Sequence, residues 1–160
     1  MGIEIERKFL VTGEAWRGRV RGAGMAMRQG YLAAGGASAP GVRVRLAGDQ
    51  AWLTVKGPGG LVRAEFEYPI PVEDARGMLA LCIAPIIEKT RFEVPHSGHL
   101  WIVDVFHGPA HLAGLVLAEI EMDSADASPP LPDWLGAEVT GDARYSNAAL
   151  VAALQADRSG

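Results

Sequence analysis

Cysteine, lysine and long apolar runs are all scarce in this chain of 160 residues. The one cysteine, Cys82, rules out a disulfide within the chain, and its apolar surroundings (MLALCI) favour a buried, unreactive thiol over a catalytic one. No apolar run approaches the roughly 20 residues that a membrane-spanning helix needs. The first ten residues carry charges where a signal peptide needs an apolar stretch. We therefore expect a cytoplasmic protein with no membrane partner.

Excess positive charge is also missing, because 15 basic residues stand against 19 acidic ones for a formal net charge of −4. A chain of this charge has no general attraction for nucleic acid, and none is expected as a partner. The length and an apolar content of 49% predict one folded domain over residues 1–160. Of the basic residues only Lys8, Lys56 and Lys89 are lysine. Either a general bias toward arginine left these three lysines by chance, or their positions need a compact ammonium group, as phosphate binding does.

Short alternating segments separated by Gly and Pro predict a mainly β protein of the α+β class. The predicted strands cover residues 3–11, 25–32, 42–47, 51–56, 62–69, 86–94, 100–106 and 115–122. Helical spacing predicts helices over 73–82 and 147–156, with a further short helix around 15–20. The Pro-, Ser- and Asp-rich segment 123–137 is predicted to be a loop with a short turn at 133–135.

Charged residues gather on one face of each predicted strand, since alternate side chains point to opposite faces. The first strand places Glu4, Glu6 and Lys8 together, and later strands repeat the division with nearly all positions ionic. An open antiparallel sheet with one wet face is the simpler explanation for any single strand. However, the signs are sorted by strand, with arginines on 42–47 and glutamates on 115–122. A barrel of about eight strands could turn these faces inward around a wet, charged tunnel.

Such a tunnel would suit a polyanion held by Arg and Lys. Guanidinium groups bind phosphate oxygens in a bidentate manner, and ammonium groups add point charge. Carboxylates without His or Cys clusters favour Mg²⁺ or Mn²⁺ over zinc. Hydrolysis of a phosphoanhydride then needs mainly positioning and charge compensation.

These residues, in this order, resemble the CYTH superfamily, also called triphosphate tunnel metalloenzymes. The first strand carries the Glu-x-Glu-x-Lys signature as Glu4-Ile5-Glu6-Arg7-Lys8. The further matching segments are Gly30-Tyr31-Leu32, Arg43-Val44-Arg45, Leu53-Thr54-Val55-Lys56, Glu65-Phe66-Glu67, Glu88-Lys89-Thr90-Arg91, Val103-Asp104-Val105-Phe106, Leu117-Ala118-Glu119-Ile120-Glu121, Glu138-Val139-Thr140-Gly141-Asp142, Arg144 and Tyr145-Ser146-Asn147. The resemblance covers roughly residues 2–155 and includes all three lysines.

The resemblance implies a closed, eight-stranded antiparallel β-barrel that forms a tunnel, with a few peripheral helices. The residues it assigns to the phosphates are Arg43, Arg45, Lys56, Lys89 and Arg91. Those it assigns to the metal or to orienting the water are Glu4, Glu6, Asp104, Glu119 and Glu121. The catalytic candidates are Glu4, Glu6 and Lys8, where Lys8 either pairs with a carboxylate or touches the phosphate chain. Glu65 and Glu67 would also lie inside among the substrate-binding residues, and Arg144 could cover one mouth of the tunnel.

The expected activity is Mg²⁺- or Mn²⁺-dependent hydrolysis of inorganic triphosphate to pyrophosphate and phosphate. Alternatives within the family are a triphosphatase for thiamine or a nucleoside, and an adenylyl cyclase of class IV type. An alternative from another class is a polyphosphate-binding module without turnover. A homodimer is a possible assembly.

Overall fold

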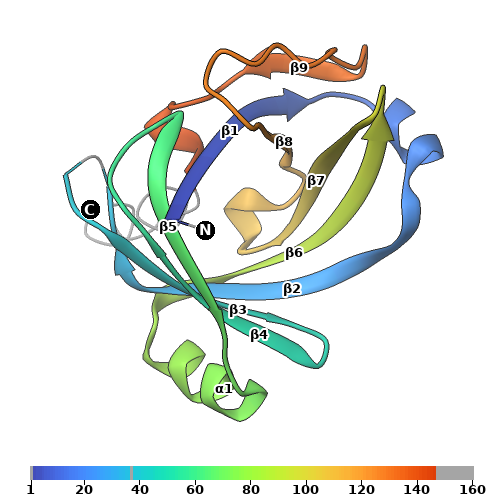
Figure 1. Cartoon of the computed structure of the whole chain (residues 1–160). Coiled ribbons are helices and arrows are strands. Elements are labelled where there is room, and N and C mark those ends of the chain that lie inside the picture. The colour runs from blue at the N-terminus through green and yellow to red at the C-terminus, as the bar shows by residue number, and fades with distance from the viewer. Residues whose placement is uncertain (1, 37, 147–160) are drawn as a thin grey trace.

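The computed structural model describes residues 2–36 and 38–146 of the chain (Figure 1). Strands make up most of this part, and the α-helical and 3-10 segments are short. The elements are β1 (Gly2–Val11), η1 (Ala15–Arg19), β2 (Arg21–Ala34), β3 (Gly41–Ala47), β4 (Gln50–Lys56), β5 (Val62–Pro69), α1 (Val72–Leu81), β6 (Ile83–His96), β7 (His99–Gly108), η2 (Ala110–Leu112), β8 (Val116–Glu121), β9 (Leu135–Glu138) and η3 (Ala143–Tyr145).

Eight of the strands close into an antiparallel barrel, which confirms the predicted fold class. The strands follow the order β5-β4-β3-β2-β6-β7-β8-β1. The ring closes where β1 pairs with β5, with Gly2 opposite Glu65 and Ile5 opposite Val62. Because every strand of the ring then has a neighbour on both sides, one face of the sheet becomes the wall of an enclosed lumen.

The ninth strand, β9, lies outside the ring and pairs with the end of β1, where Phe9 is opposite Glu138 (Figure 1). The prediction of a loop over 123–137 is therefore wrong for its last residues. Because β9 has only four residues, its alternation of side chains is too short to predict a strand from the sequence. The position of the strand depends on distant contacts, because Val139 N donates to Lys8 O and Arg7 forms an ion pair with Glu138 at 2.6 Å.

The other sequence-based elements are found close to their predicted positions. The helix α1 and the short 3-10 helix η1 are present, whereas β2 begins at Arg21 and β6 at Ile83, earlier than predicted. The predicted helix over 147–156 lies outside the described residues. Within the described part of the chain, no helix is long and apolar enough to cross a membrane.

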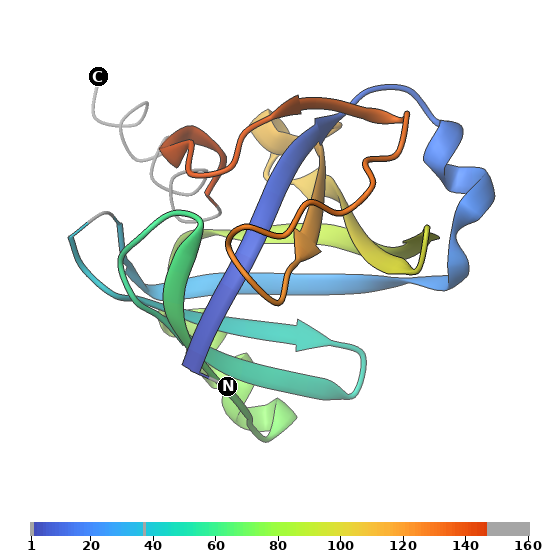
Figure 2. The same ribbon diagram turned by 45° about the horizontal axis from the view of Figure 1, so that its top comes forward.

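Peripheral elements lie against parts of the outer surface of the barrel (Figure 2). On one side, α1 buries Ala75 and Leu79 against Val44 and Ala51 of the barrel wall. On another side, η1 and the segment before β9 cover a second cluster, composed of Phe9, Trp16, Val94, Trp101, Val103, Ala118, Ile120 and Trp134. The main apolar packing thus lies outside much of the barrel wall, which leaves the lumen free to be polar.

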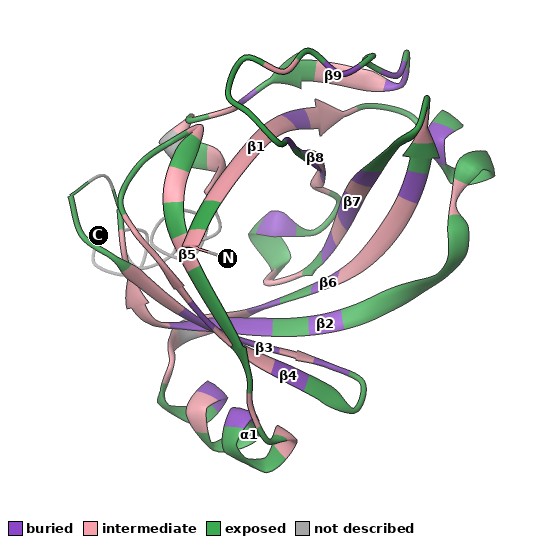
Figure 3. Ribbon diagram, in the orientation of Figure 1, coloured by how far each residue is buried: buried purple, intermediate pink, exposed green. Residues whose placement is uncertain are grey.

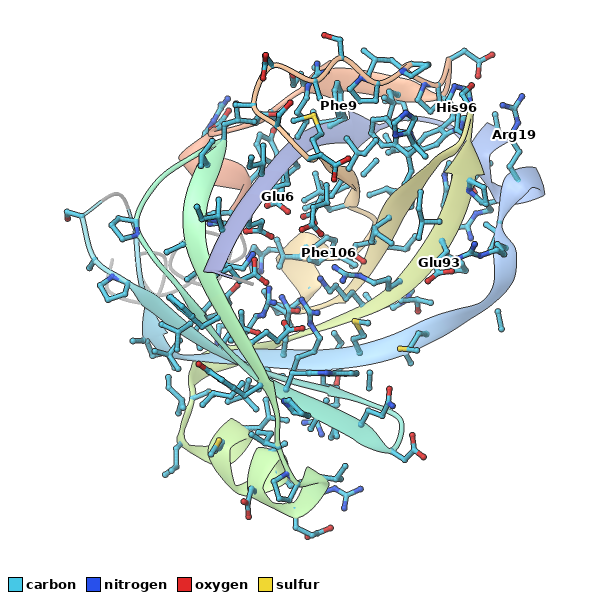
Figure 4. All side chains as sticks on the ribbon, in the orientation of Figure 1. Glu6, Phe9, Arg19, Glu93, His96 and Phe106 are labelled. Carbon is cyan, nitrogen blue, oxygen red and sulfur yellow. The ribbon has the colours of Figure 1, made fainter. Side chains whose placement is uncertain are left out.

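Part of the lumen is nevertheless apolar. A third cluster joins inward-facing Tyr31, Ile87, Phe106 and Leu117 with Leu112 of η2 and with Val139. Figure 4 shows Phe106 inside the barrel and Phe9 toward β9, on opposite sides of the wall. The inward face is therefore apolar in one layer and ionic in the rest.

Candidate active site

The ionic part of the lumen forms a cavity of about 620 Å³ among the described residues. All eight barrel strands contribute to its lining. The predicted site residues on its wall are Glu4, Glu6, Lys8, Arg43, Arg45, Lys56, Glu65, Glu67, Arg91, Glu119 and Glu121. Figure 4 shows Glu6 on the inner side of β1. The charges that sequence alternation places on one face of each strand are therefore brought together in one enclosed space.

Strand register explains how residues far apart in sequence meet in this cavity. Directly opposed pairs include Lys8 with Glu119, Lys56 with Glu65, and Arg91 with Asp104. Opposed residues point to the same face of a sheet and lie within side-chain reach of each other. The period of two along each strand and the pairing between strands thus combine into a continuous charged inner surface.

The buried arginines of β3 form the most cationic part of the wall. Arg43 and Arg45 are 6% and 9% exposed. The Arg43 guanidinium lies 3.8 Å from a carboxylate oxygen of Glu67 and donates to Thr54 Oγ1 at 3.4 Å. Arg45 has no ion pair with any residue in the described ranges. Burial and the nearby Arg43 and Arg91 lower the pKa of Arg45 to about 9, so this group is a buried cation in need of an anion.

Carboxylates occupy the opposite side of the lumen. In the closed strand order, β3 is four strands from β8 in either direction, so the arginines of β3 face the glutamates of β8 across the barrel. Glu6 of β1 is directly opposite Glu121 of β8, an unfavourable pairing of like charges. Burial, Glu119 and Glu4 raise the pKa of Glu6 to about 8. This side therefore holds more negative charge than its own lysines and arginines neutralise.

Glu4 is held by two cations at the junction of β1, β4 and β5. Lys56 Nζ donates to both carboxylate oxygens of Glu4 at 3.0 Å, and Arg63 Nε donates to one of them at 2.9 Å. Burial would raise the pKa of Glu4, but Lys56 and Arg63 outweigh it and lower that pKa well below its usual range. The second Arg63 donor reaches Glu6 at 3.1 Å. Glu65, whose carboxylate is 3.5 Å from Lys56, has its pKa raised by burial and by its hydrogen bond with Glu4.

Arg63 is a site residue that the sequence reasoning did not select. It lines the cavity and links the two carboxylates of the Glu-x-Glu-x-Lys signature. The available signal was its alternation with Glu65 and Glu67, which places it on the same face of β5. Thr54 is similar, since it lines the cavity and its hydroxyl donates to Glu67 at 2.8 Å.

Asp104 and Lys89 lie beneath the cavity wall, outside its lining residues. Asp104 is 3% exposed, and Lys89 Nζ donates to it at 2.7 Å. Arg91 donates to both Asp104 oxygens, through Nε and Nη2, each at 2.8 Å. Burial would raise the pKa of Asp104, but the two cations outweigh it and lower that pKa far below its usual range. Both oxygens are thus engaged by cations, and of the three residues only Arg91 reaches the cavity.

The remaining predicted residues lie at the edge of this arrangement. Lys8 Nζ is 3.4 Å from Glu119 and also donates to the carbonyl of Tyr145 at 3.3 Å. Arg144 has an 80% exposed side chain paired with Asp142 at 2.7 Å. Asp142 lines the cavity and Arg144 does not. The structure therefore places the segment around Arg144 at one mouth of the cavity, with the guanidinium pointing to solvent.

The carboxylate side fits a hard divalent cation that shares its ligands with a substrate. No group of three His, Cys, Asp or Glu side chains is arranged to hold a metal ion within residues 2–36 and 38–146. Mg²⁺ in phosphate-processing sites takes only one or two carboxylates and completes its shell with phosphate oxygens and water. Glu6, Glu119 and Glu121 could supply these oxygens, and the crowding that raises the pKa of Glu6 is what a cation would relieve.

Comparison with known proteins agrees with this architecture. Over 153 residues the chain is 46% identical to the inorganic triphosphatase of Acetivibrio thermocellus, covering 94% of each sequence. It is 39% identical to the inorganic triphosphatase of Nitrosomonas europaea over 155 residues, covering 92% of this chain and 95% of the relative. The crystal structure of the inorganic triphosphatase NE1496 superposes with a TM-score of 0.62 at 35% identity, covering 92% of this chain and 93% of that one.

A more distant structure shares the fold alone. The PH1819 protein of Pyrococcus horikoshii OT3 superposes with a TM-score of 0.54 at 16% identity, over 97% of this chain and 99% of that one. A family model described as the CYTH domain matches residues 2–152, which include all eight strands of the barrel. The chain therefore belongs to the CYTH domain family.

Proposed function

We propose that this protein is a metal-dependent hydrolase that cleaves inorganic triphosphate to pyrophosphate and phosphate inside its barrel. The observation that carries the proposal is the buried Arg45 guanidinium, which lies in the cavity wall without a carboxylate partner among the described residues and faces the glutamates of β8. A polyphosphate chain between these two walls would satisfy the arginines on one side and a divalent cation on the other. Relatives at 46% and 39% identity are inorganic triphosphatases.

The binding groups divide by strand. Arg43, Arg45 and Arg91 would hold phosphate oxygens through their guanidinium forks, and Lys56 would contribute point charge. Lys8 and Arg63 would keep the neighbouring carboxylates in place. Glu65 and Glu67 would orient Lys56 and Arg43, which they contact at 3.5 and 3.8 Å.

The metal, Mg²⁺ or Mn²⁺, would be held by one or two of the carboxylates of Glu6, Glu119 and Glu121, with Glu4 beside them. When bound, it supplies charge neutralisation at phosphate oxygens and a lower pKa for water. Asp104, which the family resemblance assigns to the metal or the water, is not among the proposed ligands, because Lys89 and Arg91 engage both of its oxygens. Its proposed role, together with Lys89, is to hold Arg91 toward the cavity.

The proposal is tested by measuring phosphate release from triphosphate with Mg²⁺, with Mn²⁺ and with a chelator. Turnover that requires a divalent metal and yields one pyrophosphate per phosphate is expected. A folded, metal-replete protein that releases no phosphate would rule out the hydrolase. Tight triphosphate binding without release would favour the alternative of a binding module.

Organic triphosphates provide the second comparison. Thiamine triphosphate and ATP share the phosphate chain, so the same residues could hold it. Their turnover relative to triphosphate, together with a search for cyclic AMP among the products, separates these alternatives. If kcat/KM for thiamine triphosphate or ATP exceeds that for inorganic triphosphate, the organic triphosphate is the preferred substrate and inorganic triphosphate is not.

Three broader expectations accompany this function. The chain would act as one domain over residues 1–160, in the cytoplasm, with triphosphate as its partner. A homodimer would cover exposed apolar side chains on the outer face of β1 and β5, among them Ile3, Phe66 and Tyr68. Figure 3 shows exposed stretches, in green, along β5. Sedimentation equilibrium checks the assembly, and a monomer at all concentrations would exclude the dimer.

A further inference from the structure

Gln29 is a buried polar residue inside the barrel that the proposed chemistry does not use. It belongs to β2 and is 0% exposed. Strand register places it directly between Arg45 of β3 and Ile87 of β6. Neither Oε1 nor Nε2 of its amide has a hydrogen-bond partner in the part of the chain that the structure describes. A side chain with both polar atoms buried in this way calls for a physical reason.

The cost of burying this amide would be avoided by an apolar residue of the same size. Apolar residues occupy adjacent inward positions on the same strand, Met27 and Tyr31, and the neighbour on β6 is Ile87. On the β3 side, however, the neighbour is a guanidinium group. Of the two cross-strand neighbours of Gln29, Arg45 is therefore the one that carries groups to which the amide could bond.

Arg45 supplies a matching unpaired group. Its Nε, like both amide atoms of Gln29, is buried and has no hydrogen-bond partner among the described residues. An Nε–H group is a donor and an amide Oε1 is an acceptor, so the two are complementary. Directly opposed residues of an antiparallel pair lie within reach of one another after small side-chain rotations. Arg45 lines the cavity and Gln29 does not, which places Gln29 behind the arginine as seen from the cavity.

We propose, on the basis of the proposed function, that Gln29 is a positioning residue for Arg45 in the triphosphate-bound protein. Its Oε1 accepts the Arg45 Nε–H, and this hydrogen bond turns the guanidinium so that its two terminal nitrogens form an end-on fork on one phosphate group. Gln29 itself does not touch the substrate. Its contribution is to fix the orientation of a group whose planar fork must match the phosphate geometry.

The test replaces Gln29 with leucine, and with methionine as a second variant of similar volume should the first fail to fold. Loss of the acceptor should raise KM for triphosphate by about 10-fold and leave kcat within about 2-fold, because one charge-assisted hydrogen bond is lost from binding. The melting temperature should stay equal or rise, because a buried unpaired amide has been removed. A lower melting temperature with unchanged KM would show a purely structural role and overturn the proposal.

A double-mutant cycle links the effect to Arg45. Lysine at position 45 keeps the positive charge but lacks the Nε–H of a guanidinium. In the Arg45→Lys background, Gln29→Leu should therefore have no further effect on KM. Independent, additive effects of the two substitutions would contradict the inference. Met27→Leu, a volume-conserving change on the same face of β2, serves as the control and should leave KM unchanged.

Calorimetric titration with triphosphate in the presence of Mg²⁺ separates this inference from the proposed function. If the wild-type protein binds triphosphate without hydrolysing it, the hydrolase proposal fails. Gln29 is then judged by affinity, where an approximately 10-fold weaker dissociation constant in Gln29→Leu supports positioning. If the wild-type protein does not bind triphosphate at all, both proposals are wrong.

Discussion

At the scale of single residues, the main feature of this protein is the separation of the β3 arginines from the β8 glutamates across the lumen. Arg43 and Arg45 lie on β3, and Glu119 and Glu121 lie on β8 at the opposite side of the ring. If the arginines instead sat next to those glutamates, they would form internal ion pairs and compete with substrate. The distance between the two walls keeps Arg45 available for an anion.

This separation predicts a division of labour between the two walls. Arg45→Ala removes a proposed phosphate contact and should raise KM about 10- to 100-fold, as expected for a lost charge-assisted hydrogen bond. Glu6→Gln removes a proposed metal ligand and should mainly lower kcat and raise the metal concentration required. Steady-state kinetics at several Mg²⁺ concentrations measure both effects.

Arg21→Ala is the matched control, because Arg21 forms an exposed ion pair with Glu93 and does not line the cavity. It should leave both KM and the metal requirement unchanged. If the Arg45 and Glu6 variants differed from wild type only in affinity for triphosphate, and to the same degree, the assignment of separate roles would be incorrect.

The buried group of Asp104, Lys89 and Arg91 leads to a stability prediction. Asp104→Asn leaves the fully buried Lys89 ammonium without its carboxylate, a loss that costs about 3 kcal/mol or more when a buried pair is broken on one side. Thermal denaturation should show a melting temperature lower by about 10 °C for a domain of this size.

The exposed pair of Arg144 and Asp142 provides the comparison. Asp142→Asn should leave the melting temperature unchanged, since exposed ion pairs contribute little to stability. If the melting temperature fell equally in Asp104→Asn and Asp142→Asn, burial of the ion pair would not explain the loss of stability.

At the scale of elements, the barrel wall depends on close packing of β2 against the junction of α1 and β6. A Cβ atom on Gly30 would lie 2.7 Å from Ile86 Cδ1 and 2.9 Å from both Cβ and Sγ of Cys82. Cys82 directly follows α1, so a side chain at position 30 would push the helix away from the wall. This explains why glycine stands in the Gly30-Tyr31-Leu32 segment.

Two glycine-to-alanine substitutions test this packing. Gly30→Ala should destabilise the protein by about 1–3 kcal/mol through overpacking. Gly77→Ala should stabilise it by about 0.5–1 kcal/mol, because alanine favours helix and a Cβ atom on Gly77, inside α1, would meet no other atom within 4 Å. Urea denaturation measures the free energy of unfolding of both variants. If both substitutions changed it in the same direction, the packing argument would be wrong.

At the scale of the whole molecule, the lumen is an ionic cavity enclosed by a closed sheet. Bringing its charges together without a ligand is unfavourable, as the raised pKa of Glu6 and the lowered pKa of Arg45 indicate. Burial, Glu119 and Glu4 raise the pKa of Glu6, whereas burial, Arg43 and Arg91 lower the pKa of Arg45. A ligand that brings a cation to Glu6 and an anion to Arg45 would therefore relieve both shifts.

Triphosphate with Mg²⁺ should therefore stabilise the fold more than either component alone. At a concentration 100 times the dissociation constant, the expected gain is about 2.7 kcal/mol, or a rise of about 5–10 °C in melting temperature. Differential scanning fluorimetry measures it, and Arg45→Ala at the same ligand concentrations should show a much smaller rise. An identical rise in that variant would place the ligand outside the proposed site.

Which residues share a face of a strand could be read from the amino-acid sequence, because side-chain direction along a strand follows a period of two that needs no tertiary contact. Together with the family resemblance, this allowed the eight barrel strands and most of the charged residues of the cavity wall to be predicted, including Lys8, Lys56 and the arginines of β3. Arg63 had the same signal and was missed only because no role was assigned to it.

Which charges face one another across the ring, and which form ion pairs within the wall, depends instead on how the strands pair. Asp104 and Glu119 look alike in sequence, yet the register of β7 with β6 gives Asp104 to Lys89 and Arg91, while Glu119 of β8 remains on the cavity wall. Strand β9 and the unpaired amide of Gln29 were likewise invisible beforehand. Pairing between strands joins residues that are distant along the chain, and local periodicity contains no information about those partners.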